Sequence, residues 1–236
     1  MTDVWTLPEW RTALAFAGIS LIYPVYHYAL QAPQWRARFA HRYGGDRLEI
    51  ASVLAQRYAG GLWMALASLA MALAVGLSPA ALGLGLGDPL RSLGWLLAVA
   101  LPLLPLIARG AAQPKRWGMY PQMRLQQWSR RRQGLNALAW GGYLLGYEIF
   151  FRGLCLVWLT QQFGFWPGIL ASSALYAYAH LHKDAGETFG SVAMGIVFAL
   201  MTLHSGSIWA AVILHWLMGV AGEQSAILRN PALRRG

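Results

Sequence analysis

A glutamate and an arginine stand inside an otherwise apolar stretch of the sequence. Glu148 and Arg152 are the only formally charged residues between positions 135 and 159. A charge inside a bilayer costs at least about 2.5–3.5 kcal/mol, so a carboxylate there requires a partner and a reason. Four residues separate the two side chains, which places them on one helical face and predicts an ion pair. Such a pair indicates either a functional site or a structural bridge.

Two histidines follow in later apolar stretches. These are His180 and His215, with Glu187 and Glu223 close by in sequence. Two imidazoles and a carboxylate can bind a zinc-like ion and activate its water, or act without metal as base and oxyanion donor. Glu148, His180 and His215 are therefore candidate metal ligands, and the sequence leaves a zinc metalloprotease and a metal-independent glutamate–histidine mechanism equally open. Both routes lead to hydrolysis.

Each of these groups also has a structural interpretation. A histidine in a membrane helix often serves only to hydrogen-bond a neighbouring helix. Glu187 and Glu223 can be cytoplasmic caps or loop charges. Cys155 is the single cysteine of the chain, which excludes an intrachain disulfide. Its simplest interpretation is a small apolar residue within a helix.

The composition predicts that these residues lie in membrane helices. Hydrophobic residues make up 57% of the 236 positions and charged residues 12%, against about 25% charged in a typical soluble domain. The expected fold is an all-α polytopic membrane protein with about seven transmembrane helices. The predicted spans are 12–30, 59–78, 93–108, 135–159, 164–181, 189–203 and 207–222.

The net charge of +10 is concentrated in loops. Basic loops mark the cytoplasmic side of a membrane protein, so the alternation along the chain places the N-terminus outside and the C-terminus in the cytoplasm, in the cell inner (plasma) membrane. The same loops suit anionic lipid headgroups, at about 1 kcal/mol per basic residue, and no nucleic-acid partner is expected. The basic residues are Arg36, Arg38, Arg42, Arg47 and Arg57 in one group and Arg109, Lys115, Arg116, Arg124 and Arg130 to Arg132 in the other.

No repeat or low-complexity linker divides the chain, so one structural domain is expected. Within it, residues 1–134 form a three-helix membrane region with basic cytoplasmic loops, and residues 135–226 form the core that holds the candidate site. Gly142 and Gly146 have the small-xxx-small spacing that allows two helices to approach closely.

Three segments carry a resemblance to a known family. They are Glu-Ile-Phe-Phe-Arg-Gly at 148–153, Tyr-Ala-Tyr-Ala-His at 176–180 and Ser-Ile-Trp-Ala-Ala-Val-Ile-Leu-His at 207–215. In order and separation these resemble the three motifs of the CPBP intramembrane proteases, also called the CAAX protease or Abi family, over about residues 140–224. The resemblance implies an intramembrane endopeptidase that hydrolyses a peptide bond in a membrane-anchored protein or peptide substrate. The composition, rich in Ala, Arg and Trp, favours a bacterial origin.

The chain departs from the family pattern at two positions. The first motif usually has two glutamates, and the first of them, thought to activate water, corresponds to Tyr147. The third motif usually continues to an asparagine that supports the oxyanion, and Gly219 stands there. The sequence resembles a branch with an aromatic residue before a single glutamate and a further glutamate, here Glu187, seven residues after the second-motif histidine.

The resemblance implies roles for five residues. Glu148 or Glu187 would activate water together with His180, His215 would donate to the oxyanion, and Arg152 would keep Glu148 ionised and oriented. Tyr147 adds a hydroxyl, but position i−1 of a helix is expected to face away from the side chain of Glu148. His180 is expected near the cytoplasm and Glu148 and His215 near mid-membrane, which requires a water-filled cleft open to the cytoplasm.

Two other classes of function compete with the protease. A catalytically silent relative, acting as a membrane binding or immunity protein, is consistent with Tyr147 and Gly219, and it would tolerate loss of either histidine. A transporter or proton relay would also use buried Glu, Arg and His, but it predicts inverted repeats or paired broken helices. The sequence shows neither of these features.

Overall fold

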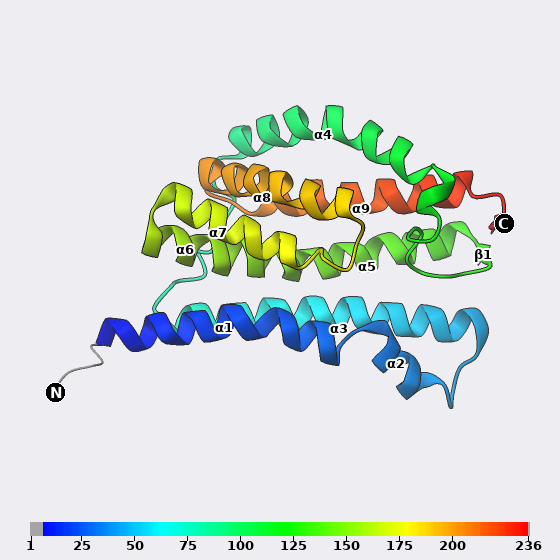
Figure 1. Cartoon of the computed structure of the whole chain (residues 1–236), viewed down its shortest axis with the longest axis horizontal. Coiled ribbons are helices and arrows are strands. Elements are labelled where there is room, and N and C mark those ends of the chain that lie inside the picture. Colours follow the sequence, from blue (N-terminus) through cyan, green and yellow to red (C-terminus); the bar gives the residue numbers. More distant parts are fainter. Residues whose placement is uncertain (1–6, 236) are drawn as a thin grey trace.

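The computed structural model describes residues 7–235, and it is built from helices that run along one long axis (Figure 1). The predicted all-α class is confirmed, with a single two-residue strand pair, β1 with β2, in the described chain. Residues 1–6 of the predicted N-terminal region lie outside the described part. The elements are α1 (Leu7–Ala29), α2 (Ala32–Phe39), α3 (Gly45–Ala74), α4 (Pro89–Ala111), the 3₁₀ turn η1 (Pro114–Arg116), β1 (Gln127–Trp128), α5 (Arg130–Glu148), the π-helix η2 (Ile149–Cys155), α6 (Leu156–Phe163), α7 (Phe165–Tyr178), α8 (Ala185–Ser205), α9 (Trp209–Arg229) and β2 (Arg234–Arg235).

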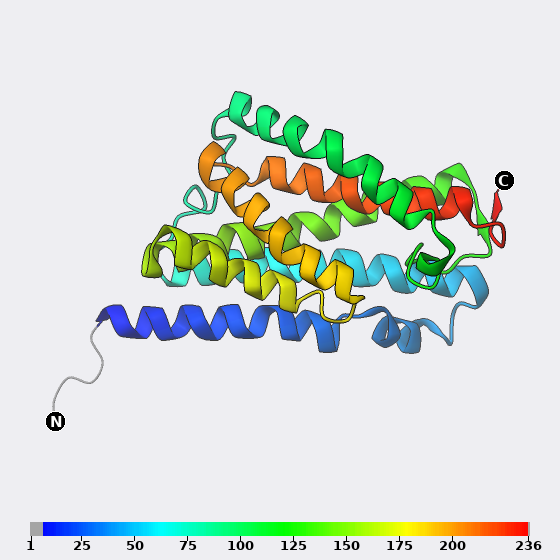
Figure 2. The ribbon, with the colours of Figure 1, turned by 45° about the horizontal axis from the view of Figure 1, so that its top comes forward.

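The helices form layers that two views show in the same order. Helices α1 and α3 lie side by side in one layer, α5 to α9 form the next, and α4 covers the far side (Figures 1 and 2). Helix α3 packs on α5, and α4 packs on α9. The largest apolar core cluster lies between these layers and includes Met64, Phe151 and Leu214. The candidate site residues therefore lie on the central layer, with helices on both sides.

Glycines set the contact between the first two layers. A methyl group on Gly146 would collide with the carbonyl oxygen of Gly61, and one on Gly61 would collide with that of Gly142. The close helix contact predicted from the spacing of Gly142 and Gly146 is confirmed, with α3 as the partner. It brings the backbone of α3 against the last turn of α5, immediately before Tyr147 and Glu148.

Within residues 7–235, five helical stretches are long and apolar enough to cross a membrane. They are 9–39, 89–111, 130–163, 185–205 and 209–229. The other two predicted spans fall in α3 and α7. Helix α3 begins 14 residues before the predicted span at 59, because the polar segment 45–58 is also helical. Helix α7 has 14 residues, about 21 Å at 1.5 Å per residue, which is shorter than a bilayer core of about 30 Å. A polytopic membrane protein is supported, and the count of seven spans remains a prediction.

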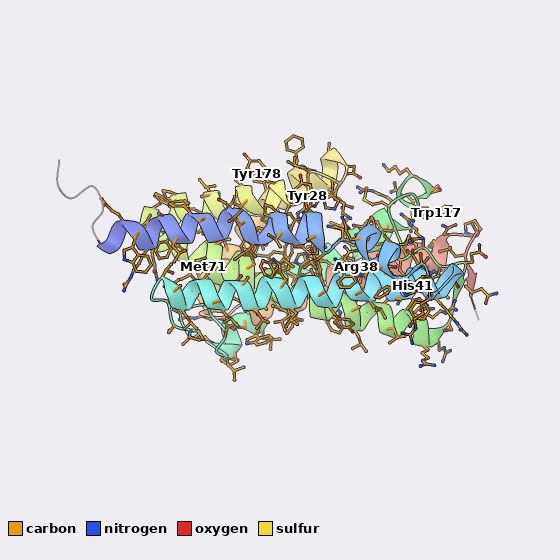
Figure 3. All side chains as sticks on the ribbon, turned by 90° about the horizontal axis from the view of Figure 1, so that it is seen from below. Tyr28, Arg38, His41, Met71, Trp117 and Tyr178 are labelled. Atoms are coloured by element: carbon orange, nitrogen blue, oxygen red, sulfur yellow. The ribbon has the colours of Figure 1, made fainter. Side chains whose placement is uncertain are left out.

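Successive long helices run in opposite directions, so the loops gather at two ends (Figure 1). Arg38, His41 and Trp117 lie toward one end, and Met71 lies toward the other (Figure 3). The link between α7 and α8 is an exception, because both views place it well inside the long axis rather than at the end near the C-terminus (Figures 1 and 2). His180 lies on this short return.

Caps fix where the helices of the site begin and end. The Asp184 side chain accepts a hydrogen bond of 2.9 Å from the backbone N–H of Glu187 and starts α8. The helix ends at Gly206, whose φ of 68° lies in the left-handed region that glycine adopts without strain. Asp184 therefore holds Glu187 on the first turn of α8, where a carboxylate is favoured by the helix dipole.

Candidate active site

The first motif lies where α5 changes from an α-helix to a π-helix. Glu148 is the last residue of α5, and Arg152 lies within the seven-residue π-helix that follows. All seven residues of this segment are buried. π-helical turns are rare and occur mostly at functional sites, because the extra residue redirects the side chains around them. The sequence predicted one regular helix here and gave no signal for the change in winding.

Glu148 and Arg152 form the predicted ion pair. The Nε atom of Arg152 lies 3.1 Å from Oε2 of Glu148, and both side chains are fully buried. The guanidinium also lies over the rings of Tyr176, at 4.6 Å, and Phe198, at 5.2 Å. The aromatic faces stabilise the cation where water is excluded. Breaking such a buried pair would leave an uncompensated charge, so each partner maintains the other.

His215 on α9 contacts the same carboxylate from the other side. Its Nδ1 atom lies 2.5 Å from Oε1 of Glu148. An ionised carboxylate only accepts hydrogen bonds, so Nδ1 carries the proton. The bond fixes the orientation and tautomer of the imidazole and stabilises a positive charge on it, as an acidic residue does behind a catalytic histidine. Glu148 does not line the cavity described below, so it acts through His215 rather than on a substrate.

His180 is held in an analogous way. It follows the last turn of α7, and its Nδ1 atom lies 2.9 Å from the carbonyl oxygen of Tyr176. A carbonyl oxygen is an acceptor, so Nδ1 donates and the Nε2 atom of the neutral ring keeps its lone pair. Tyr23 of α1 bonds the neighbouring carbonyl of Ala179 at 3.0 Å and fixes the chain at this point. Within residues 7–235, neither His180 Nε2 nor His215 Nε2 makes a hydrogen bond.

Tyr147 stands against both imidazoles. Its ring centroid lies 6.4 Å from that of His180 and 5.6 Å from that of His215, in edge-on geometry in both cases. The sequence placed this side chain away from Glu148. Tyr147 nevertheless lies at the site. The end of α5 is buried on all sides, and His215 contacts both Tyr147 and Glu148. Tyr147 therefore belongs to the candidate site.

One cavity connects the two histidines with the basic loops. It has a volume of about 760 Å³, and Tyr147, Tyr176, His180 and His215 line its inner part. Its outer part is lined by Arg116, Tyr120, Arg124, Lys183 and Glu187. The expected cleft from the histidines to the loop region is therefore present. The difference in membrane depth expected between His180 and His215 stays a prediction.

Glu187 lies at the outer part of this cavity and not beside Glu148. Its carboxylate accepts a hydrogen bond from Tyr120 Oη at 3.1 Å and pairs with Arg116 at 2.9 Å. Lys183 lies 3.9 Å from the same carboxylate, with its ammonium 5.0 Å from the centre of the Tyr120 ring. Asp184 also pairs with Arg116, at 2.5 Å. We refer to Arg116, Tyr120, Lys183, Asp184 and Glu187 as the mouth cluster.

Two groups of the mouth cluster have shifted pKa values. Burial raises the pKa of Tyr120, and the charge of Glu187 raises it further, so the hydroxyl remains a donor. Burial lowers the pKa of Lys183, whereas the charge of Glu187 opposes that shift. Sequence reasoning missed the roles of Arg116 and Tyr120, since they come from a loop about 70 positions before Glu187. The basic character of a loop does not indicate which acidic residue it will contact in the fold.

A second buried polar network corrects two interpretations of the sequence. Glu223 is not a loop charge, since it lies in α9 at 1% exposure and accepts bonds from Asn136 and from the backbone N–H of Gln122, each at 2.9 Å. Arg57 is not a loop residue either, because it is buried in α3 and bonds Oδ1 of Asn136 at 2.5 Å. Its guanidinium lies 4.2 Å from the ring centre of Trp140. The charges are retained in the core because Asn136 connects them.

The candidate metal ligands do not converge as a metal site requires. Among residues 7–235, no group of three His, Cys, Asp or Glu side chains is placed to hold an ion. Within this part of the chain the two imidazoles have unbonded Nε2 atoms, but Glu148, the candidate third ligand, is held by His215 and Arg152. A catalytic zinc site takes three protein ligands and an open position. The donor set as arranged does not fit a metal.

The fold and the site define a class of protein. The chain is a helical, polytopic membrane-type protein in which a buried glutamate–histidine pair and a second histidine open into one cavity. Residues 120–221 match the family described as type II CAAX prenyl endopeptidase Rce1-like, and this part of the chain belongs to that family. The match begins before the predicted core at 135 and therefore includes Tyr120. No curated protein and no solved structure gives a significant match.

Proposed function

We propose that the protein is an intramembrane endopeptidase that cleaves a membrane-associated protein or peptide without a metal ion. His180 and His215 are the catalytic residues, because they line the cavity that a substrate would enter. Glu148 and Arg152 are positioning residues behind His215. Glu187 organises the cavity mouth rather than the chemistry. The end with the basic loops faces the cytoplasm, where it contacts anionic lipid headgroups.

The geometry supports a two-histidine mechanism. His180 Nε2 accepts a proton from water while the water oxygen bonds to the carbonyl carbon of the substrate. His215, carrying protons on both nitrogens beside the Glu148 carboxylate, donates a hydrogen bond from Nε2 to the resulting oxyanion. The tetrahedral intermediate then collapses, the C–N bond breaks, and the amine leaving group takes the proton held by His180. The products are a new carboxylate and a new amine.

A single observation carries this proposal. Each imidazole has its Nδ1 atom fixed by an acceptor, the Tyr176 carbonyl for His180 and the Glu148 carboxylate for His215. Each ring is therefore held in a defined orientation, and both residues line the same cavity. A histidine that only joins two helices needs neither a cavity nor a second histidine beside it. The Nδ1 partner of His180 is a neutral carbonyl, which suits a neutral imidazole that acts as a base. The partner of His215 is a charged carboxylate, which suits a protonated imidazole that acts as a donor.

A catalytically silent protein is the second candidate, and Tyr147 and Gly219 favour it. The family pattern places a glutamate and an asparagine at these positions, so a water-activating group and an oxyanion donor are missing. A silent protein would keep the cavity as a binding site. It would bind the same peptides before and after loss of His180, whereas the protease would lose cleavage and keep binding.

The test uses purified protein in vesicles that contain anionic lipid, incubated with a mass-encoded library of N-acylated peptides. Wild type is expected to generate defined products and to incorporate ¹⁸O from labelled water into one new carboxyl group per cut. The variants His180→Ala and His215→Ala should lose at least about 10³-fold in rate. His204→Ala is the matched control, because its ring bonds Trp95 outside the cavity lining. Cleavage that persists in His180→Ala at wild-type rate would reject the proposed base.

A further inference from the structure

Tyr147 has a feature that packing does not explain. The residue is 3% exposed, and within residues 7–235 its hydroxyl has no hydrogen-bond partner. A buried hydroxyl without a partner costs about 1–3 kcal/mol. Phenylalanine would fill the same volume without that cost. The hydroxyl therefore requires a partner that is present at another stage of the protein's cycle.

The position of the ring indicates where that partner binds. Tyr147 lines the cavity, and its ring stands edge-on to both His180, at 87°, and His215, at 80°. Both imidazoles line this cavity and contact the Tyr147 ring, so a reacting carbonyl that is bound between the two histidines must also lie close to Tyr147. The rings of Phe151 and Tyr176 lie at centroid distances of 4.5 and 5.8 Å; the Phe151 ring has no acceptor, and the Tyr147 hydroxyl makes no hydrogen bond to Tyr176.

We propose that the hydroxyl of Tyr147 is a second donor to the oxyanion of the peptide carbonyl, beside Nε2 of His215. This assignment rests on the proposed endopeptidase function. The hydroxyl keeps its proton throughout and contributes a hydrogen bond that is strongest when the carbonyl oxygen becomes negative. It supplies the support that the family pattern places at the position of Gly219. Tyr147 is then a catalytic residue of a different chemical type from the glutamate usual at its position.

A neighbouring tyrosine gives a matched comparison. Tyr143 lies one turn earlier on α5 and also lines the cavity, but its hydroxyl is already bonded to Tyr26. A tyrosine that serves structure is expected to be bonded in this way. Tyr143→Phe therefore removes a hydroxyl of the same type from the same cavity without removing the proposed donor.

The experiment compares Tyr147→Phe and Tyr143→Phe on a peptide that wild type cleaves. Loss of an oxyanion donor should lower kcat about 10²–10³-fold in Tyr147→Phe, with KM within about twofold of wild type. Tyr143→Phe should keep kcat within about threefold of wild type. Thermal unfolding of Tyr147→Phe should occur at or above the wild-type temperature, since no hydrogen bond is lost. If the hydroxyl had a structural role, Tyr147→Phe would unfold at a lower temperature than wild type.

Rescue provides a readout specific to oxyanion support. Gly219 lines the same cavity one turn after His215, and a Cβ atom there meets only Trp140 and Leu144, at 3.6 Å or more. Gly219→Asn in the Tyr147→Phe background should therefore recover at least tenfold in kcat. A wild-type kcat in Tyr147→Phe overturns the proposal. So does a loss that comes with a lower unfolding temperature and no rescue.

The outcome also separates this inference from the proposed function. If His180→Ala abolishes cleavage and Tyr147→Phe does not, only the role of Tyr147 fails. If His180→Ala leaves cleavage unchanged, the two-histidine mechanism is rejected. The assignment of Tyr147 as an oxyanion donor is then rejected as well, because it depends on that mechanism. If wild type cuts no peptide of the library, both are rejected together.

Discussion

Two carboxylates that the sequence presents as equivalent candidates have different surroundings. Glu148 is fully buried between Arg152 and His215 at the inner end of the cavity. The Glu187 side chain is 24% exposed and is held by Arg116, Tyr120 and Lys183 at the outer end. Both have cationic partners, but only Glu148 touches an imidazole. An ion pair is therefore a poor marker of chemistry, whereas a carboxylate behind a histidine in a cavity is a good one.

The difference also separates two kinds of energetic contribution. Water is excluded around Glu148, so its charge acts strongly on Arg152 and His215. Around Glu187, partial exposure screens the charges, and exposed or half-exposed ion pairs contribute at most about 1 kcal/mol each. Removing the inner charge should impair catalysis, and removing the outer charge should mainly alter how the two loops hold the mouth.

The largest effect is expected for Glu148→Gln. The amide keeps the shape of the side chain but removes the charge behind His215, so the imidazole loses the stabilisation of its positive charge. The rate of peptide cleavage should fall by about 10³–10⁴-fold. The measurement is kcat for wild type and variant on one peptide.

Glu223→Gln is the matched control for that variant. Glu223 is equally buried and shares α9 with His215, but its partners are Asn136 and the backbone of Gln122. It should retain kcat within about tenfold of wild type if the protein reaches the membrane at a normal level. Equal losses of kcat in Glu148→Gln and Glu223→Gln would mean that a buried carboxylate matters only for stability. The position of Glu148 behind His215 would then have no special role in catalysis.

Hydropathy predicted most of the helices but not their local geometry. The positions of α1, α4, α8 and α9 follow from apolar runs of sufficient length. The helical segment 45–58 could not be found in this way, because its charged residues have their hydrogen-bond partners far along the chain, such as Asn136 for Arg57. The π-helix likewise depends on packing around Arg152 rather than on a local residue preference.

The candidate site was predicted as a set of residues and not as an arrangement. The ion pair of Glu148 with Arg152 followed from spacing alone. Spacing cannot reveal that Glu148 faces His215, or that Glu187 meets Tyr120, since each contact joins elements about 67 positions apart. Tyr147 was expected to face away from Glu148, and spacing along α5 could not reveal that its ring lies against both His180 and His215.

A smaller effect is expected for Glu187→Gln. The hydrogen bond from Tyr120 can persist to an amide, but the charge that holds Arg116 is lost, so the mouth cluster loosens. KM should rise by about two- to tenfold with kcat within about threefold of wild type. Kinetics of Glu187→Gln, Arg116→Gln and the double variant form the test. Non-additive effects are expected because the two residues share one ion pair. A loss of kcat as large as that in Glu148→Gln would instead make Glu187 a catalytic group.

The pH dependence of stability should report on the mouth cluster through Lys183. Burial lowers the pKa of Lys183 in the folded protein, so the charged form is less favourable there than in the unfolded chain. This cost is complete below the folded pKa and declines as pH rises toward the unfolded value of about 10.4. Lys183→Met should therefore raise the unfolding temperature at pH 7, and its advantage should shrink at pH 10. An advantage that stays constant with pH would show that removal of the charge is not its cause.

No effect is expected from metal removal, and the reason again lies in the contrast between the two carboxylates. Glu148 faces His215 and Arg152, and Glu187 faces Tyr120, Arg116 and Lys183, so neither is free to join the histidines around an ion. Cations beside both carboxylates also disfavour a further positive charge. Dialysis against a zinc chelator should leave kcat within experimental error of wild type. Chelation that abolishes cleavage and zinc that restores it would overturn this prediction, and it would show that an ion binds the Nε2 atoms of the histidines with a further ligand that the present arrangement does not supply.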